Sequence, residues 1–132
     1  MPSRSDDLLS LELPCDEHAP VIVRAALAEV HDGGWSLDDG RLVASELVGN
    51  AVRHSGCQLQ HRLRIRVSRH EGRLRISVHD PGLSGRVADP VDGDAAEPGG
   101  WGLRIIGQLS EAWGTERPDG YRVWAELPAR AY

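Results

Sequence analysis

The chain has 132 residues, of which 40% are hydrophobic and 27% are charged, and its formal net charge is -5. This size and composition are typical of one ordinary globular domain with a hydrophobic core. The negative balance argues against a binder of duplex DNA or RNA, which needs a basic face to neutralise phosphates. The stretch HRLRIRVSRHEGRLR is locally basic, but its arginines alternate as solvent-facing residues on two strands would.

The cysteines and the apolar runs of the sequence indicate the cellular compartment in which the protein is expected. Cys15 and Cys57 lie far apart and neither belongs to a C-x-x-C pair, so neither a zinc site nor a disulfide is expected. No apolar run reaches membrane-spanning length, and the N-terminus lacks the apolar stretch of a signal peptide. We therefore expect a single domain over residues 1–132, without membrane association, in a reducing cytoplasm.

The N-terminal half predicts one strand and two helices. The stretch LLSLELP alternates leucine with other residues and stops at Pro14, as an edge strand does. Asp16 is placed to cap a helix over about residues 17–30. Ser36 is the N-cap candidate of a second helix, which should run to about His54 and stop at the Ser-Gly pair that follows.

The C-terminal half predicts a hairpin, a long loop, a third helix and two final strands. RLRIRVSR and RLRISVHD alternate with period two around HEG, which predicts one apolar and one arginine-rich sheet face. Residues 81–100 are rich in Gly, Pro and Asp without periodicity, which is typical of a functional or disordered loop. WGLRIIGQLSEAWG predicts the third helix and YRVWAELP the last strand. This order predicts an α+β fold, a two-layer sandwich with helices on one face of a mixed, mostly antiparallel sheet.

Three polar residues recur at intervals of four along the second predicted helix: Glu46, Asn50 and His54. That spacing places them on one helix face. Asn50 offers an amide oxygen, a hard neutral ligand suited to Mg²⁺ beside phosphate oxygens. Glu46 can accept a proton from a hydroxyl nucleophile or a water. On spacing alone, a partly buried polar face with local hydrogen bonds is an equal alternative.

Two further motifs suit a nucleotide. Asp80 ends an apolar strand and Gly82 follows it, so the carboxylate can accept a hydrogen bond from an exocyclic amine such as that of adenine; an ordinary Asp-Pro-Gly turn is the alternative. In GGWGLRII, Gly100 and Gly102 lie where a helix is expected to begin, and the backbone N–H groups and helix dipole there favour phosphate. A simple helix start is the alternative reading. Neither a Walker loop nor a Rossmann fingerprint is present.

In this order, with a long loop between the second and the third, the motifs resemble those of the GHKL ATPase superfamily, which has the Bergerat fold. The helix motif is similar to its N box, the Asp80 motif to its G1 box and the paired glycines to its G2 box. Residues 83–99 are similar to its ATP lid. The resemblance implies ATP and Mg²⁺ as cofactors, with Asn50 as the Mg²⁺ ligand and Asp80 as the adenine reader. The implied nucleotide site consists of Asn50, Asp80, Gly82, Gly100, Gly102 and Leu103.

Within that superfamily, ELVGNAVRH, DPG, GGWGLRII and VWAELP resemble most the stand-alone anti-sigma-factor serine kinases of actinobacterial type. The resemblance implies a protein that binds a sigma factor and phosphorylates a serine or threonine of an anti-anti-sigma partner of STAS type, with Glu46 as the catalytic base. It also allows a homodimer through the sheet side. It places Arg122 where relatives often carry a threonine near adenine, so that its cation either narrows the pocket or points outward.

Two other readings of the sequence stay open. A non-catalytic regulator of the same fold, with weak or no nucleotide binding, is favoured by Arg122 and by the acidic residues of the lid. A histidine kinase catalytic domain is the other. A complete histidine kinase would need a helical segment with a phosphoacceptor histidine, and we expect no room for one before the first strand.

Overall fold

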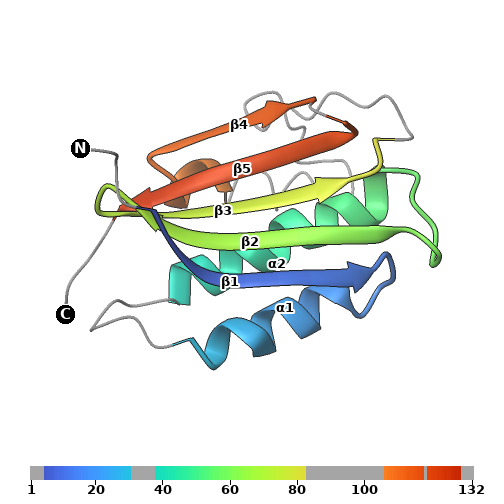
Figure 1. Ribbon diagram of the computed structural model, residues 1–132, viewed down its shortest axis with the longest axis horizontal. Helices are drawn as coiled ribbons and strands as arrows, with labels where there is room; N and C mark the ends of the chain where they lie inside the picture. The colour runs from blue at the N-terminus through green and yellow to red at the C-terminus, as the bar shows by residue number, and fades with distance from the viewer. Residues whose placement is uncertain (1–4, 31–37, 83–105, 118, 129–132) are drawn as a thin grey trace.

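The described chain forms two layers, a five-stranded sheet and helices packed on one of its faces (Figure 1). The computed structural model describes residues 5–30, 38–82, 106–117 and 119–128. Residues 106–109 form a helical turn. In chain order, the other elements are β1 (Ser5–Pro14), α1 (Ala19–Ala28), α2 (Asp38–His54), β2 (Arg62–His70), β3 (Arg73–Asp80), β4 (Ala112–Glu116) and β5 (Tyr121–Pro128).

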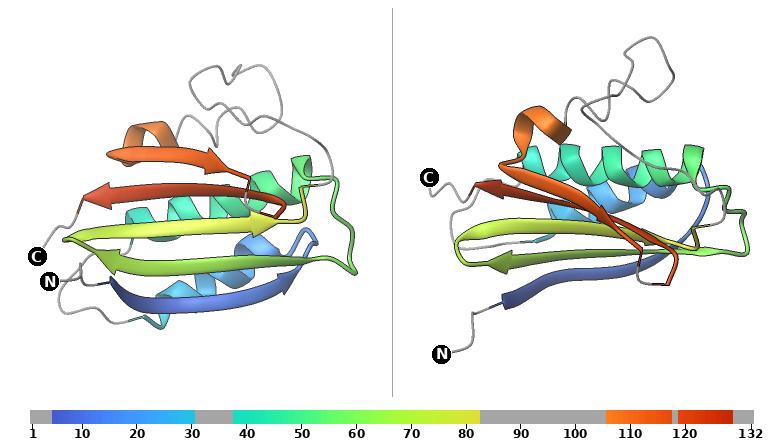
Figure 2. Two further views of the ribbon diagram at one scale, coloured as in Figure 1. Left: turned by 45° about the horizontal axis from the view of Figure 1, so that its top comes forward. Right: turned by 90° about the horizontal axis from the view of Figure 1, so that it is seen from above.

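The strands have the order β1-β2-β3-β5-β4, and every neighbouring pair is antiparallel. The predicted α+β sandwich with helices on one sheet face is confirmed (Figure 2), although the described strands pair only antiparallel and not in a mixed sheet. The predicted hairpin is β2 and β3. Glu71 and Gly72 connect the two strands with φ angles of 49° and 77°, as a two-residue turn of type I′ requires.

Alternate strand residues point toward the helices and form the core. The buried row is at most 2% exposed on the hairpin and comprises Leu63, Ile65, Val67, Leu74, Ile76 and Val78. The opposite face carries the arginines, several of which form ion pairs between strands: Arg64 with Glu12, Arg66 with Asp7, and Arg75 with Glu126. The locally basic stretch therefore consists largely of outward-facing strand residues, as predicted, and each exposed ion pair contributes little stability.

Helix α2 runs along β3 in the same direction as the strand. At its start, Gly40 lies so close to Leu74 that a Cβ at this position would be 2.7 Å from the leucine Cδ2 atom. The rise from Gly40 to Asn50 is about 15 Å along a helix, and that from Leu74 to Asp80 is about 20 Å along a strand. The last turns of α2 therefore lie over the end of β3.

Two predicted element boundaries differ from the structure. Helix α1 begins at Ala19 with His18 as its N-cap, and the Asp16 carboxylate accepts a hydrogen bond from the His18 backbone N–H at 2.7 Å. The prediction that one helix continues through residue 114 is wrong, because residues 112–116 form β4. Pairing with β5 overrides the local preference there, and Gly114 lies against the indole of Trp124. The Ser36 cap and the predicted lid fall outside the described residues.

The expectation that the cysteines do not form a disulfide is wrong. Cys15 and Cys57, 42 positions apart, are bonded to each other, with a Cα–Cα distance of 6.1 Å. The reason is topological: Pro14 at the end of β1 pairs with Arg62 at the start of β2. This pairing brings the residue after β1 beside the segment that leads into β2. Among the described residues, no helix is both long and apolar enough to cross a membrane.

Candidate functional site

Most of the buried polar side chains lie near the ends of α2 and β3. Among the described residues, the buried polar or charged side chains are Ser45, Asn50, Ser55 and Asp80. Ser45 and Asn50 lie on α2, Ser55 directly follows it, and Asp80 is the last residue of β3. Because polar groups are buried only with partners or for function, each of these side chains needs a physical explanation.

Asn50 is 3% exposed, and its Oδ1 atom has no hydrogen-bond partner within the described part of the chain. A buried acceptor without a donor is destabilising, so an external donor or cation is the natural complement. Ser45, on the same helix, is satisfied: its hydroxyl donates to the Leu42 carbonyl at 2.9 Å and accepts from Arg24 at 3.2 Å. A polar helix face with local hydrogen bonds, the alternative interpretation, therefore explains Ser45 but not the Asn50 oxygen.

Glu46 lies one turn before Asn50 on α2 and is partly exposed. Residues four apart lie on one helix face, so the predicted carboxylate and amide share that face. His54, one turn beyond Asn50, is exposed at the end of the helix. Helix α2 thus carries the partly exposed carboxylate of Glu46 next to the buried amide of Asn50.

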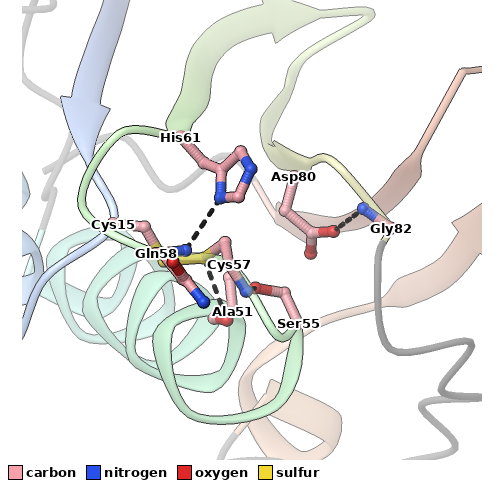
Figure 3. The surroundings of a disulfide bond; sticks show 8 residues. All are labelled: Cys15, Ala51, Ser55, Cys57, Gln58, His61, Asp80 and Gly82. Atoms are coloured by element: carbon pink, nitrogen blue, oxygen red, sulfur yellow. Dashed lines mark hydrogen bonds between the residues drawn. A yellow bond between two sulfur atoms is a disulfide. The ribbon is translucent and has the colours of Figure 1, made fainter.

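Asp80 ends the row of β3 residues that point toward the helices and is 1% exposed. Its Oδ1 atom accepts a hydrogen bond from the Gly82 backbone N–H at 2.7 Å (Figure 3). The Asp-Pro-Gly turn, which was the alternative interpretation of this motif, is therefore present. A carboxylate has about four lone-pair positions, so it can accept the Gly82 N–H and further hydrogen bonds at the same time. The turn and a ligand-reading role are therefore compatible.

The backbone around Asp80 is fixed by close packing against the turn before β5. Gly82 and Gly120 have φ angles of 70° and 104°. A Cβ at Gly82 would lie 2.9 Å from the Gly120 backbone, and one at Gly120 would collide with the Asp80 carbonyl oxygen. His79 Nε2 is also hydrogen bonded to the Asp119 carbonyl at 2.6 Å. Gly82 is needed for this approach, and the role of Gly120 was missed although its Pro-Asp-Gly sequence is a turn signal.

The structure places Arg122 away from this site. Asp80 pairs in register with Tyr121, and paired residues share a sheet face, so the buried Tyr121 lies on the side of Asp80. Arg122 points to the other face, where its guanidinium forms an ion pair with Glu116 at 2.9 Å. Of the two alternatives for Arg122, the outward one is correct.

Together, a two-layer antiparallel sandwich with a buried asparagine on the helix and a buried aspartate at the strand end define a domain of the Bergerat type. Residues 17–126 match the family of the histidine kinase-like ATPase domain. The chain belongs to this family. No curated protein matches the chain in sequence.

A solved structure also resembles the chain, the histidine kinase domain from the blue-light activated histidine kinase of Erythrobacter litoralis EL346. The TM-score is 0.51 and the sequence identity 22%, over 68% of this chain and 43% of that chain. At this identity the likeness concerns the fold, and the present chain spans less than half of that structure. Family membership supports an ATP-binding role, which fits the positions of Asn50 and Asp80. Gly100, Gly102 and Leu103 lie outside the described residues.

Proposed function

We propose that the protein is an ATP-dependent regulator that binds a sigma factor and phosphorylates a serine or threonine of an anti-anti-sigma partner of STAS type. The observation that supports nucleotide binding is the buried Asn50 oxygen, which has no hydrogen-bond partner among the described residues. The kinase and sigma-factor parts rest on the sequence motifs, which resemble those of anti-sigma-factor kinases. The family match, over residues 17–126, supports the ATPase type of the domain.

The residues present fit a magnesium nucleotide. Asn50 would hold the metal through its amide oxygen, which is the hard oxygen donor that Mg²⁺ prefers. Bound Mg²⁺ would neutralise charge on the phosphate oxygens. Asp80, held by the Gly82 N–H, would accept a hydrogen bond from the exocyclic amine of adenine. Glu46 would orient the partner's hydroxyl group and accept its proton.

A non-catalytic regulator of the same fold is the alternative. Arg122 was one argument for it, because a cation in the adenine pocket would oppose binding. Its ion pair with Glu116 on the outer sheet face removes that argument. The acidic lid residues, the other argument, lie outside the described residues.

Calorimetry with Mg-ATP tests the nucleotide part. We expect the wild-type protein to bind, and Asn50→Ala and Asp80→Asn each to weaken binding about 10- to 100-fold, because each removes a contact to a charged or metal-bound group. Ser45→Ala is the matched control, since Ser45 is buried on the same helix with a satisfied hydroxyl. A wild-type protein that shows neither heat nor thermal shift with Mg-ATP would favour the non-catalytic alternative.

A further inference from the structure

The Cys15–Cys57 disulfide lies beside the candidate nucleotide site (Figure 3). Cys15 directly follows β1, and Cys57 comes just after the end of α2. The Cys57 sulfur is 3.9 Å from the carbonyl oxygen of Ala51, the residue that follows Asn50. The crosslink therefore contacts the turn of α2 that carries the proposed metal ligand.

The segment between α2 and β2 is held in place by hydrogen bonds around the crosslink. The Cys57 N–H donates to Ser55 Oγ at 3.1 Å, and the Gln58 N–H donates to His61 Nδ1 at 2.8 Å. The Cys15 N–H donates to the His61 carbonyl at 3.2 Å. The disulfide and this last hydrogen bond both connect the segment to the junction of β1 and α1. Breaking the disulfide therefore removes the covalent one of these two connections.

The disulfide is also within reach of a reagent. Both cysteines line an open surface hollow of about 700 Å³, whose other lining residues include Asp16, His18, Gln58 and Leu59. Cys15 is 5% exposed, whereas Cys57 is partly exposed and is therefore the more accessible residue of the two. Disulfides that are accessible in this way exchange with thiols more readily than fully enclosed ones.

We propose that Cys15–Cys57 is a redox-modification site for dithiols, such as the active-site dithiol of a thioredoxin-like protein, and that its reduction weakens nucleotide binding. The second half rests on the proposed function. One thiolate of the dithiol attacks Cys57 Sγ, the Cys15–Cys57 bond breaks, and Cys15 leaves as a thiolate that takes up a proton. The second thiol then attacks the mixed disulfide and releases Cys57 as a thiol. Two electrons and two protons pass to the protein, and the dithiol becomes a disulfide.

The reduced protein keeps its fold but loses order next to Asn50. The ladder from β1 to β2, which ends with Pro14 paired to Arg62, does not need the crosslink. Reduction removes the covalent bond between the segment that holds Cys57 and the junction of β1 and α1. The segment from Ser55 to His61 becomes freer, and a ligand that binds at Asn50 must then order it, which lowers affinity.

The test compares the oxidised full chain with the chain treated with dithiothreitol. Alkylation and mass spectrometry count thiols, amide hydrogen exchange reports residues 51–61, and calorimetry measures Mg-ATP binding. We expect two thiols per chain with an unchanged circular dichroism spectrum, exchange at least tenfold faster in that segment, and Mg-ATP binding three- to tenfold weaker. Re-oxidation with glutathione disulfide should restore all three. The double variant Cys15→Ala/Cys57→Ala should have the hydrogen exchange and Mg-ATP affinity of the reduced protein, and dithiothreitol should change neither.

Three outcomes would overturn the proposal. The first is thiols that appear only after denaturant is added, because the disulfide would then be purely structural. The second is complete reduction with unchanged hydrogen exchange. The third is unchanged affinity in a protein that does bind Mg-ATP. If the wild-type protein binds no Mg-ATP in either state, the proposed function fails, and thiol counting and hydrogen exchange still decide whether the redox site exists.

Discussion

The buried oxygen of Asn50 allows function to be tested through stability. An unpartnered buried acceptor destabilises a fold by about 1–3 kcal/mol, and Asn50 is 3% exposed with no partner for Oδ1 among the described residues. Leucine is close to asparagine in shape and has a better helix propensity. Allowing for the lost amide donors, we expect Asn50→Leu to raise the free energy of unfolding by about 1–2 kcal/mol in the absence of nucleotide.

With Mg-ATP bound, the wild-type protein should become more stable than Asn50→Leu. A ligand at 100 times its Kd stabilises the wild-type protein by about 2.7 kcal/mol, and Asn50→Leu should gain far less because it lacks the metal ligand. Urea unfolding of both proteins, with and without Mg-ATP, measures this change in their relative stability. Ser45→Ala is the control: its hydroxyl is satisfied, so it should lose stability in both conditions and keep the gain from ligand. An Asn50→Leu protein that is less stable than wild type without nucleotide would refute the argument.

Three other variants test the proposed catalytic base, the adenine pocket and the disulfide separately. Glu46→Gln should leave Mg-ATP affinity within about tenfold but lower phosphorylation of the partner by roughly 10²–10⁴-fold, measured with labelled ATP; an unchanged rate would remove Glu46 from the mechanism. Arg122→Thr should leave nucleotide affinity within about threefold in calorimetry and alter stability by at most about 1 kcal/mol, since it breaks only a partly exposed ion pair with Glu116; a clear loss of affinity would contradict the outward placement. Cys15→Ala/Cys57→Ala should lower the free energy of unfolding in urea by up to about 4 kcal/mol, from the loop entropy of a 42-residue separation; a urea midpoint equal to that of the oxidised wild type would contradict a formed crosslink.

Local patterns predicted the elements whose state depends on local sequence. The hairpin of β2 and β3 follows from period-two alternation around a turn, and both strands match the prediction. Two final strands were predicted, but the position of β4 was not, because AWGTE carries no alternation and its first residues were assigned to the third helix. Its state is set by pairing with β5, in which Gly114 makes room for the indole of Trp124. Such a pairing partner is invisible in a single window of sequence.

Two features of the site depend on tertiary register, which the sequence does not carry. The resemblance placed Arg122 near adenine, whereas the observed register pairs Asp80 with Tyr121 and puts Arg122 on the opposite sheet face. In a strand, a shift of one residue moves a side chain to the opposite face. The cysteines illustrate the same limit, since only the antiparallel pairing of β1 with β2 brings Cys15 next to Cys57. The motifs predicted a polar helix face, but only the structure shows that the Asn50 oxygen is buried with no partner among the described residues.

The two halves of the site are held by different physical means. Asp80 is fixed by backbone packing, because Gly82 and Gly120 approach so closely that neither tolerates a side chain. Packing of this kind has no chemical switch, so the proposed adenine-reading end of the site would be preorganised whether the disulfide is oxidised or reduced. Asn50 instead lies on a helix whose end is tied to the rest of the fold by a bond that can be broken and remade. On the proposed function, a change in redox state would therefore act on the Asn50 end of the site and not on the Asp80 end, so it would alter how strongly a nucleotide binds without altering which base is recognised.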